Sequence, residues 1–380
     1  MNEYKRLGDY IREVNVRNRD LKVTNLLGVN LSKQFFPSIA NIIGTDLSKY
    51  KIIEKGQFGC KFMSVGRDGV LPISLKKDDV PAIISSAYCV FEVENKNILL
   101  PEYLMMWLCR PEFDRQLSFY AGGDVRGGVN YEDFCEMPII IPSIERQREI
   151  VAEYETLTRR IRLNEQIIQN LETTAQTLYR KMFVDGIDKE NLPEGWRMGR
   201  FTDLVNISGG GTPNTDEESY WNGDIPFFTP LDSGNGYYCV KTTKMLTFEG
   251  FNNCSSKLYK KDTIFVTARG TVGKIAIASM DMAMNQSCYA LLSKIEDTHF
   301  YVHQFAIETI FSLQEEALGA VFNALVTKDF ETKKVIIPTE KQMKEYNILV
   351  ESIYEQILLK QQENKNLTEL QSLLLVRLGE

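Results

Sequence analysis

Few residues of this chain form patterns that support catalysis or metal binding. Only two histidines occur among 380 residues, His299 and His303, and their spacing of four places both on one face of a helix. A metal site would need further ligands or a motif such as HExxH, which is missing, so we expect a solvated helix face and no metal. The seven cysteines are widely spaced and include no CxxC pair, which predicts neither a zinc site nor a set of disulfides.

Two glycine-containing stretches come close to known ligand-binding motifs without matching them. Residues 268–275, ARGTVGKI, approach a phosphate-binding P-loop, but Ala268 replaces its first glycine and Ile275 replaces the hydroxyl residue that would hold magnesium. Gly209-Gly210-Gly211 leads into Thr212-Pro213 rather than into a helix, so it is not a dinucleotide fingerprint. The sequence therefore does not predict nucleotide binding.

Motifs for hydrolysis and group transfer are also missing. The sequence has no GxSxG elbow, no Asn-Pro-Pro-aromatic tetrapeptide of an amino-methyltransferase and no Pro-Asp…Asp/Glu-x-Lys nuclease pattern. A cysteine nucleophile at Cys60, Cys89 or Cys288 is an alternative, but no nearby histidine supports it, and a buried cysteine is the simpler interpretation. We therefore expect a chain without catalytic activity.

Polar loops that contain glycine or arginine remain as candidate binding elements. One is Ser64–Gly69, SVGRDG, whose counterpart 203 residues later is Thr267–Thr271, TARGT. The other is Gly122–Gly128, GGDVRGG, whose counterpart is Leu318–Asn323. Glycine lets a backbone approach a ligand closely, and an arginine fork can contact guanine O6 and N7. The alternative for each loop is a tight turn with a solvated arginine.

The chain is a tandem repeat. Residues 139–142 read IIIP and residues 335–338 read VIIP, an offset of 196 at which Asp133-Phe134 also matches Asp329-Phe330. Each copy begins with short β-prone runs separated by turn residues, continues with an apolar strand that ends in proline, and then enters a long helix. This order predicts two similar α+β units, each followed by a helix.

The two helices are expected to form a coiled coil. From Ile150, steps of alternately four and three residues reach nine apolar residues out of ten, and the same positions 196 residues later hold seven. Such heptad spacing is typical of a coiled coil, in which the polar Asn164, Lys360 and Asn364 would fix register or orientation. The alternative is two amphipathic helices that pack separately on their own domains. The expected contact positions are Ile150, Tyr154, Leu157, Ile161, Asn164, Ile168, Leu171, Ala175, Leu178 and Met182, with Tyr346, Val350, Ile353, Ile357, Lys360, Asn364, Leu367, Gln371, Leu374 and Leu378.

Composition excludes several classes of protein. Apolar residues make up 43% and charged residues 25% of the chain, which is ordinary for a globular protein. No apolar run of 18 residues occurs, so no membrane span is predicted. The first residues lack the apolar segment of a signal peptide and the cysteines show no disulfide pattern, so we expect a cytoplasmic protein.

Together these features resemble one protein family. An α+β domain, the stretch Ile140–Gln147 (IIPSIERQ) and a long heptad helix, all repeated once, are similar to the specificity (S) subunits of type I restriction–modification systems. Gly209–Pro213 followed by Tyr220–Pro226, and Ala268–Lys274, are further family-like stretches. The resemblance covers nearly the whole chain. The second copy departs from the pattern, since Pro338–Gln342 is one residue shorter than the first.

The resemblance implies a non-catalytic reader of DNA sequence. Each α+β unit would be a target recognition domain for one half of a bipartite target, and the helices would form an antiparallel coiled coil that separates the domains and docks two methyltransferase (M) subunits. S-adenosylmethionine and ATP would bind to partner subunits rather than to this chain, and restriction (R) subunits would join for cleavage. The implied segments are 1–142 and 191–338 for the recognition domains, 143–190 for the first conserved helix and turn, and 339–380 for the second conserved helix.

The candidate DNA contacts lie in the polar loops. We expect Arg67 and Arg126 to contact the first half-site, and Arg269 with Lys274 the second. The net charge of −7 is unusual for a DNA-binding protein, so the chain alone should bind DNA weakly. The other hypothesis is a coiled-coil scaffolding protein without nucleic-acid binding, which accounts for the helices but not for the duplicated loops. The full set of expected DNA-binding residues is Ser64, Arg67, Arg126, Thr212, Arg269, Lys274 and Asn323.

Overall fold

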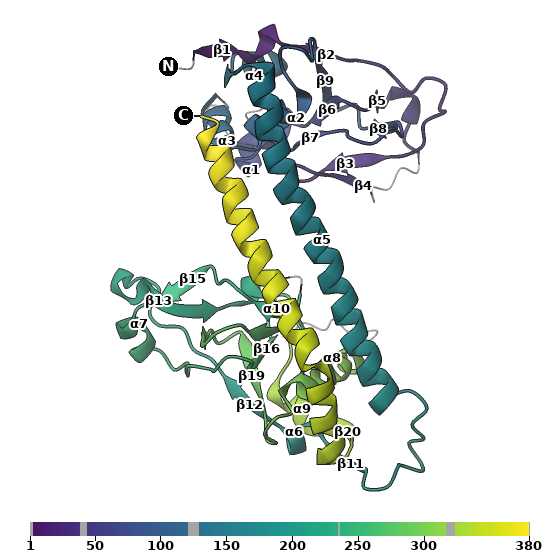
Figure 1. Cartoon of the computed structure of the whole chain (residues 1–380), viewed down its shortest axis with the longest axis vertical. Helices are drawn as coiled ribbons and strands as arrows, with labels where there is room; N and C mark the ends of the chain where they lie inside the picture. Colours follow the sequence, from purple (N-terminus) through teal and green to yellow (C-terminus); the bar gives the residue numbers. More distant parts are fainter. Residues whose placement is uncertain (1–2, 39–43, 121–128, 235, 317–323, 380) are drawn as a thin grey trace. The chain divides into compact units, whose positions relative to one another are not determined.

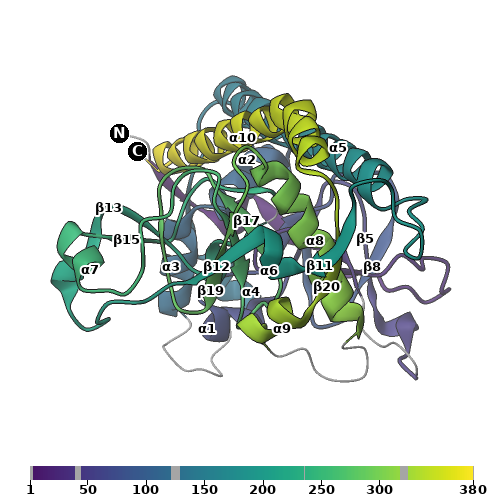
Figure 2. The same cartoon turned by 90° about the horizontal axis from the view of Figure 1, so that it is seen from below.

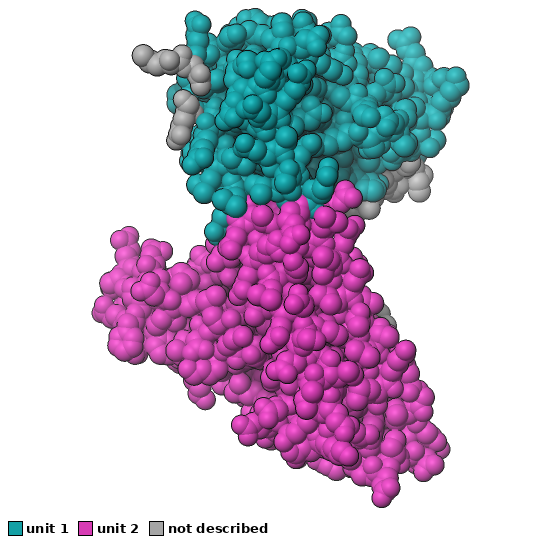
Figure 3. Space-filling model, in the orientation of Figure 1, with its two compact units in different colours: residues 1–159, 368–380 teal, residues 160–367 magenta. Residues whose placement is uncertain are grey.

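The chain folds into two compact units. The computed structural model describes residues 3–38, 44–120, 129–234, 236–316 and 324–379 (Figure 1). Unit 1 comprises Met1–Arg159 with Thr368–Glu380, and unit 2 comprises Arg160–Leu367 (Figure 3). Two long helices, α5 (Ile144–Phe183) and α10 (Glu340–Arg377), contribute residues to both units. No helix among the described residues is both long and apolar enough to cross a membrane.

Unit 1 contains a four-stranded antiparallel sheet. The strands of unit 1 as a whole are β1 (Tyr4–Arg6), β2 (Ile11–Glu13), β3 (Leu27–Val29), β4 (Phe35–Pro37), β5 (Lys51–Ile53), β6 (Gln57–Cys60), β7 (Ile73–Leu75), β8 (Ala82–Ile84), β9 (Cys89–Val93) and β10 (Pro138–Ile140). The sheet has the order β2-β9-β6-β7, and the pairs β1–β10, β3–β4 and β5–β8 lie outside it. Phe58 on β6 lies opposite Phe91 on β9 with stacked rings 4.8 Å apart, a cross-strand pair that stabilises the register.

Unit 2 contains a related five-stranded sheet. The strands of unit 2 as a whole are β11 (Arg197–Arg200), β12 (Val205–Gly209), β13 (Trp221–Phe228), β14 (Tyr238–Cys239), β15 (Lys244–Leu246), β16 (Ile264–Thr267), β17 (Ile275–Ala278), β18 (Ala283–Met284), β19 (Cys288–Ser293) and β20 (Lys334–Ile337). The sheet has the order β12-β19-β16-β17-β14. A separate three-stranded sheet, β15-β13-β18, has its own small apolar cluster around Phe227 and Leu246.

The repeat in the sequence is a repeat in strand order. The four strands β2-β9-β6-β7 of unit 1 correspond in sequence order and pairing to β12-β19-β16-β17 of unit 2. The pair β1–β10 likewise corresponds to β11–β20. Unit 2 adds β14, which pairs in parallel with β17. The two domains therefore each contain a sheet with the same strand order, and they differ in the smaller strand pairs around it.

Proline and capping residues set the boundaries of the domain helices. Pro101 and Pro111 are the first residues of their helices, where the missing N–H costs nothing. The helix that carries Phe134 begins with a capping box, in which the Asn130 side chain accepts from Asp133 N at 2.7 Å. The helices of unit 1 are α1 (Val65–Asp68), α2 (Pro101–Leu108), α3 (Pro111–Tyr120) and α4 (Tyr131–Cys135), and those of unit 2 are α6 (Phe201–Leu204), α7 (Phe248–Asn252), α8 (His299–Glu316) and α9 (Thr327–Thr332).

Helices α5 and α10 form an antiparallel coiled coil (Figures 1 and 2). In unit 2 the amides of Asn164 and Asn364 are joined by a hydrogen bond of 2.8 Å, and the Tyr346 hydroxyl donates to the Ala175 carbonyl at 2.9 Å. In unit 1 the Gln371 amide donates to Thr158 at 2.7 Å. All twenty predicted contact positions are buried or half-buried. The predicted coiled coil is confirmed, and the alternative of two separately packed helices is wrong.

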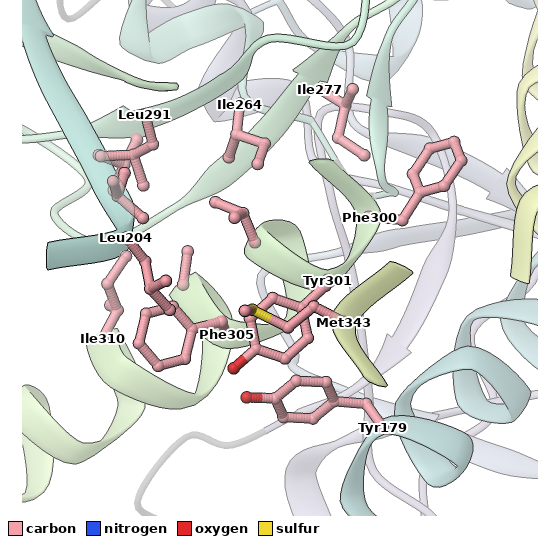
Figure 4. Close-up of a cluster of buried hydrophobic side chains, with 14 of the residues drawn as sticks. Tyr179, Leu204, Ile264, Ile277, Leu291, Phe300, Tyr301, Phe305, Ile310 and Met343 are labelled. Atoms are coloured by element: carbon pink, nitrogen blue, oxygen red, sulfur yellow. The ribbon is translucent and has the colours of Figure 1, made fainter. Parts of the chain in front are cut away.

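Each domain completes its core with side chains from the two helices. In unit 2, the ring of Tyr179 from α5 lies 5.7 Å from that of Tyr301 of α8, and Figure 4 shows the two side by side. The same ring lies 5.8 Å from that of Tyr346 of α10. In unit 1, Val151 of α5 and Leu378 belong to the same buried cluster as the sheet. Burial of one large apolar side chain contributes about 1.5–3 kcal/mol, so the helices are part of each domain and not merely a connection.

The first turns of both helices are fastened by a glutamine. The buried Gln147 side chain donates to the carbonyls of Ile98 and Pro142, at 2.7 and 2.9 Å, and accepts from Leu100 N at 2.8 Å. Gln342 has other partners: it accepts from the Trp196 indole at 2.8 Å and from the Thr339 hydroxyl at 2.7 Å. The shorter second motif therefore still provides a glutamine that anchors the helix to its domain.

The two histidines do not form a solvated helix face, so that expectation is wrong. His303 is 1% exposed, and its Nδ1 lies 2.8 Å from the Tyr354 hydroxyl of α10. Burial lowers the pKa of His303 to about 3, so the ring is neutral at physiological pH. His299 is half-buried. No group of three possible metal-binding side chains occurs among the described residues.

The paired asparagines in the seam make a prediction about stability. We expect Asn164→Leu alone to lower the free energy of unfolding by about 1–3 kcal/mol, because the side-chain carbonyl of the half-buried Asn364 loses the donor that the completely buried Asn164 supplies. The double variant Asn164→Leu/Asn364→Leu should restore most of that loss, because two apolar side chains then face each other. Urea denaturation measures both values. Asn366→Leu, at an exposed position of α10, is the control. Additive losses of stability in the double variant would contradict the prediction.

Candidate nucleic-acid interface

The first candidate loop connects β6 and β7 in unit 1. It folds as a short 3-10 helix, Phe62–Ser64, followed by α1, and Gly69 ends α1 in the left-handed region at φ +65°. Arg67 lies on α1 with an exposed side chain. Its guanidinium forms two hydrogen bonds to the carboxylate of Asp68, at 2.9 and 2.8 Å. The fork that would contact a guanine or a phosphate is therefore held by the neighbouring residue.

This ion pair changes the electrostatics of the loop. The hydrogen bonds to Asp68 raise the pKa of Arg67, and those from Arg67 lower the pKa of Asp68. Both groups are therefore charged at any physiological pH. The Arg67 side chain is exposed and solvent screens the pair, so a DNA phosphate or base can compete with Asp68 for the arginine.

Ser64 occupies a different environment from Arg67. It is 5% exposed, and its backbone N–H donates to the Lys61 carbonyl at 3.2 Å. The burial argues against a direct DNA contact by this side chain, so its role stays a prediction.

The end of the loop is held from inside the domain, because the buried Asp114 accepts from Leu71 N at 3.1 Å and from the Lys33 ammonium at 2.7 Å.

Both ends of the second loop of unit 1 lie beside the first loop. Arg126 itself is outside the described residues. Before the loop, Ser118 on α3 donates to the Gly69 carbonyl at 3.2 Å. After it, the ring of Tyr131 lies 6.5 Å from that of Phe62. The described residues on either side of this segment therefore lie next to the turn that carries Arg67.

The corresponding loop of unit 2 connects β16 and β17. Arg269 and Lys274 are exposed on it, and no carboxylate among the described residues pairs with either. The carbonyl of Ser287, the residue before β19, accepts from the backbone N–H groups of Ala268 and Arg269 at 2.8 and 3.3 Å. Unlike Arg67, these two cations are available to a ligand without breaking an ion pair.

Thr212 belongs to the same cluster of unit 2. Its hydroxyl donates to the side-chain carbonyl of Gln286, next to the Ser287 that holds Arg269. The preceding Gly211 donates to the Met284 carbonyl at 3.0 Å, and a Cβ there would lie 2.1 Å from the Ser255 hydroxyl. The glycine run before Thr212 therefore serves close packing of two loops.

Asn323 lies outside the described residues, but the ends of its loop are placed. Gln314, near the end of α8, lies against Gly273, where a Cβ would be 2.6 Å from the glutamine amide. On the other side, Leu325 N donates to the Ala268 carbonyl at 2.9 Å. As in unit 1, the second loop begins and ends beside the first.

The structure thus groups the candidate residues by unit. Each unit brings the turn between two central strands together with the ends of a second polar loop. Sequence reasoning placed Asp68 and Thr267 in the candidate loops but did not assign them their contacts with Arg67 and Lys274, and it missed Gln286. Asp68 is adjacent to Arg67 in the sequence, so its pairing was recognisable, whereas the contact of Gln286 with Thr212 joins residues 74 positions apart.

Comparisons with known proteins give the family. The sequence matches the type I restriction modification DNA specificity domain over residues 73–173 and 193–369. It is 25% identical to the type I restriction enzyme HindI specificity subunit of Haemophilus influenzae, over 98% of this chain and 97% of that protein. It is 30% identical to the type I restriction enzyme MjaIX specificity subunit of Methanocaldococcus jannaschii, over 43% of this chain and 39% of that protein.

A solved structure shows the same fold. The crystal structure of a type I restriction-modification system S subunit from M. genitalium matches with a TM-score of 0.58 and 13% identity, covering 99% of this chain and 95% of that one. The duplicated α+β domain with two long paired helices is therefore a fold that this chain shares with that structure. This chain belongs to the family of type I restriction–modification DNA specificity subunits. The alternative of a scaffolding protein without nucleic-acid binding has no support.

The ion pair of Arg67 makes a prediction about DNA affinity. Asp68→Asn should bind DNA about two- to fivefold more tightly than the unchanged protein at low salt, because the Arg67 guanidinium is then no longer held by a carboxylate. Asp79→Asn removes the same charge from the exposed pair with Lys55 and is the matched control. Titrations by fluorescence anisotropy compare the two. Equal affinities of the two variants would show that Arg67 does not approach DNA.

Proposed function

We propose that this chain reads both halves of a bipartite DNA target, one with each α+β domain. The observation that carries the proposal is the duplicated sheet, which presents its turn with exposed cations at the corresponding position in each copy. In the proposed division, residues 1–142 and 191–338 are the recognition domains, and residues 143–190 and 339–380 are the conserved helical segments.

The proposed roles of the loop residues follow from their exposure. Arg269 and Lys274 are exposed and unpaired within the described residues, and so can make contacts with base edges or phosphates of the second half-site. Arg67 can do the same for the first half-site once it leaves Asp68. Arg126 and Asn323 lie outside the described residues, and their contacts with DNA are proposed from the sequence alone.

The helices are proposed to dock two methyltransferase subunits. In unit 2, α10 exposes Ile348 and Leu359, which are 73% and 56% exposed and eleven residues apart, close to three full turns. In unit 1, the same helix exposes Leu370 and Leu373 at 49% and 58%. Large exposed apolar side chains on a face that the coiled coil leaves open favour a protein partner. One such patch in each unit fits one methyltransferase subunit per unit.

The charge of the chain supports a division of labour with these partners. With a net charge of −7, the chain offers little general attraction to phosphates. The methyltransferase subunits would supply much of the phosphate binding together with S-adenosylmethionine. Restriction subunits would bring ATP-dependent cleavage. The complex would act in the cytoplasm, where it meets both foreign and host DNA.

Binding measurements with and without the partner test this proposal. The chain alone should bind a duplex weakly and without preference, in the range of about 10⁻⁴ to 10⁻⁶ M typical of non-specific binding. With methyltransferase subunits, the duplex that carries the target should bind about 10³-fold or more tightly than a shuffled duplex of equal length. Methylation sequencing of the host genome provides the target. Equal binding of both duplexes by the complex would contradict the proposal.

A further inference from the structure

The turn that carries Arg269 and Lys274 has a defined backbone. Seven residues, 268–274, connect the last residue of β16 to the first of β17. Thr267 N donates to the Lys274 carbonyl and Gly273 N donates to the Thr267 carbonyl, both at 2.9 Å. Gly270 and Gly273 have positive φ angles, +81° and +84°, which side-chain-bearing residues rarely adopt. The backbone of Thr267 is therefore the base on which the turn closes.

The Thr267 side chain also holds the turn. The residue is completely buried, and its hydroxyl donates to the Thr271 carbonyl while it accepts from Lys274 N at 3.0 Å. The hydroxyl thus joins the middle of the turn to its end. Because a buried polar group without a partner is costly, these bonds restrict the turn to the conformation in which they form.

A second support acts on the other side of Arg269. The Ser287 carbonyl accepts from both Ala268 N and Arg269 N. The backbone at Ala268 and Arg269 is therefore attached to the sheet. The conformation of the segment after Arg269 depends instead on the Thr267 hydroxyl. The position of Lys274 depends on that hydroxyl directly, because its own N–H is the donor.

The first domain has a cysteine in place of this threonine. Cys60 lies opposite Cys89 where β6 pairs with β9, and Thr267 lies opposite Cys288 where β16 pairs with β19. A thiol is only a weak hydrogen-bond donor. The turn of unit 1 is instead built as α1 and held by Ser118 and Asp114. The two turns therefore depend on different groups, although their strands correspond.

We propose that Thr267 is a positioning residue for the second half-site: its hydroxyl fixes the turn so that Arg269 and Lys274 meet defined atoms of the DNA. The inference rests on the proposed function of the two domains. It assigns Thr267 no contact with DNA. Its effect should be confined to the half-site that unit 2 reads, because the turn of unit 1 has no equivalent hydroxyl.

The test compares Thr267→Val with Thr267→Ser in the complex with methyltransferase subunits. Valine keeps the shape and removes the hydroxyl, whereas serine keeps the hydroxyl. Methylation rates are measured on the cognate target and on duplexes with single-base changes in either half-site. For Thr267→Val, discrimination at the second half-site should fall about tenfold, and discrimination at the first should stay within about twofold of the unchanged protein. Thr267→Ser should retain both.

Thr271→Val is the matched control, because the exposed Thr271 contributes only its backbone carbonyl to the turn. If Thr267→Val does not assemble, Thr267→Cys, which introduces the residue of the first domain, is expected to show the same selective loss. Unchanged discrimination at the second half-site, or equal losses at both half-sites, would overturn the inference. Absence of any half-site discrimination by the unchanged complex would instead contradict the proposed function.

Discussion

The apolar seam between α5 and α10 is the interaction on which the rest of the structure depends. Ala175, Tyr346 and Ile357 are completely buried in it, and each belongs to the cluster that also contains the sheet of unit 2. The sheet of unit 1 closes in the same manner over Val151 and Leu378. Neither domain buries its apolar face without the helices. The packing of the seam and the packing of the domain cores therefore depend on each other.

In the proposed function, the DNA contacts lie on turns that project from the sheets. A turn between strands carries little core, so its sequence can change without loss of the fold. The two copies use that freedom differently: Arg67 is held by Asp68, while Arg269 follows a threonine that fixes the backbone from beneath. One strand order therefore supports two differently constructed turns, which suits the proposed reading of two different half-sites.

The sequence predicted the structure correctly where apolar residues recur at a regular spacing and are buried together. The heptads from Ile150 predicted the seam because apolar spacing at that period has few other uses, and the repeated Asp-Phe pairs marked corresponding helices. It was uninformative where one residue's environment comes from a distant segment. His303 was expected to be solvated, but Tyr354 of α10 covers it. Ser64 was expected to contact DNA, which stays a prediction, and its burial in a short 3-10 helix was not foreseen. Neither contact leaves a pattern in the sequence.

Hydrogen exchange after disruption of the seam tests the shared core most directly. Ala175→Asp places a charge at a fully buried position that no domain strand contributes. If the helices complete the core, β16 and β19 should lose protection together with the facing segments of α5 and α10. Gln176→Asp, one residue away and exposed, should leave protection unchanged. Loss of protection in the helices alone, with β16 and β19 still protected, would show that the second domain has an independent core and would contradict this account.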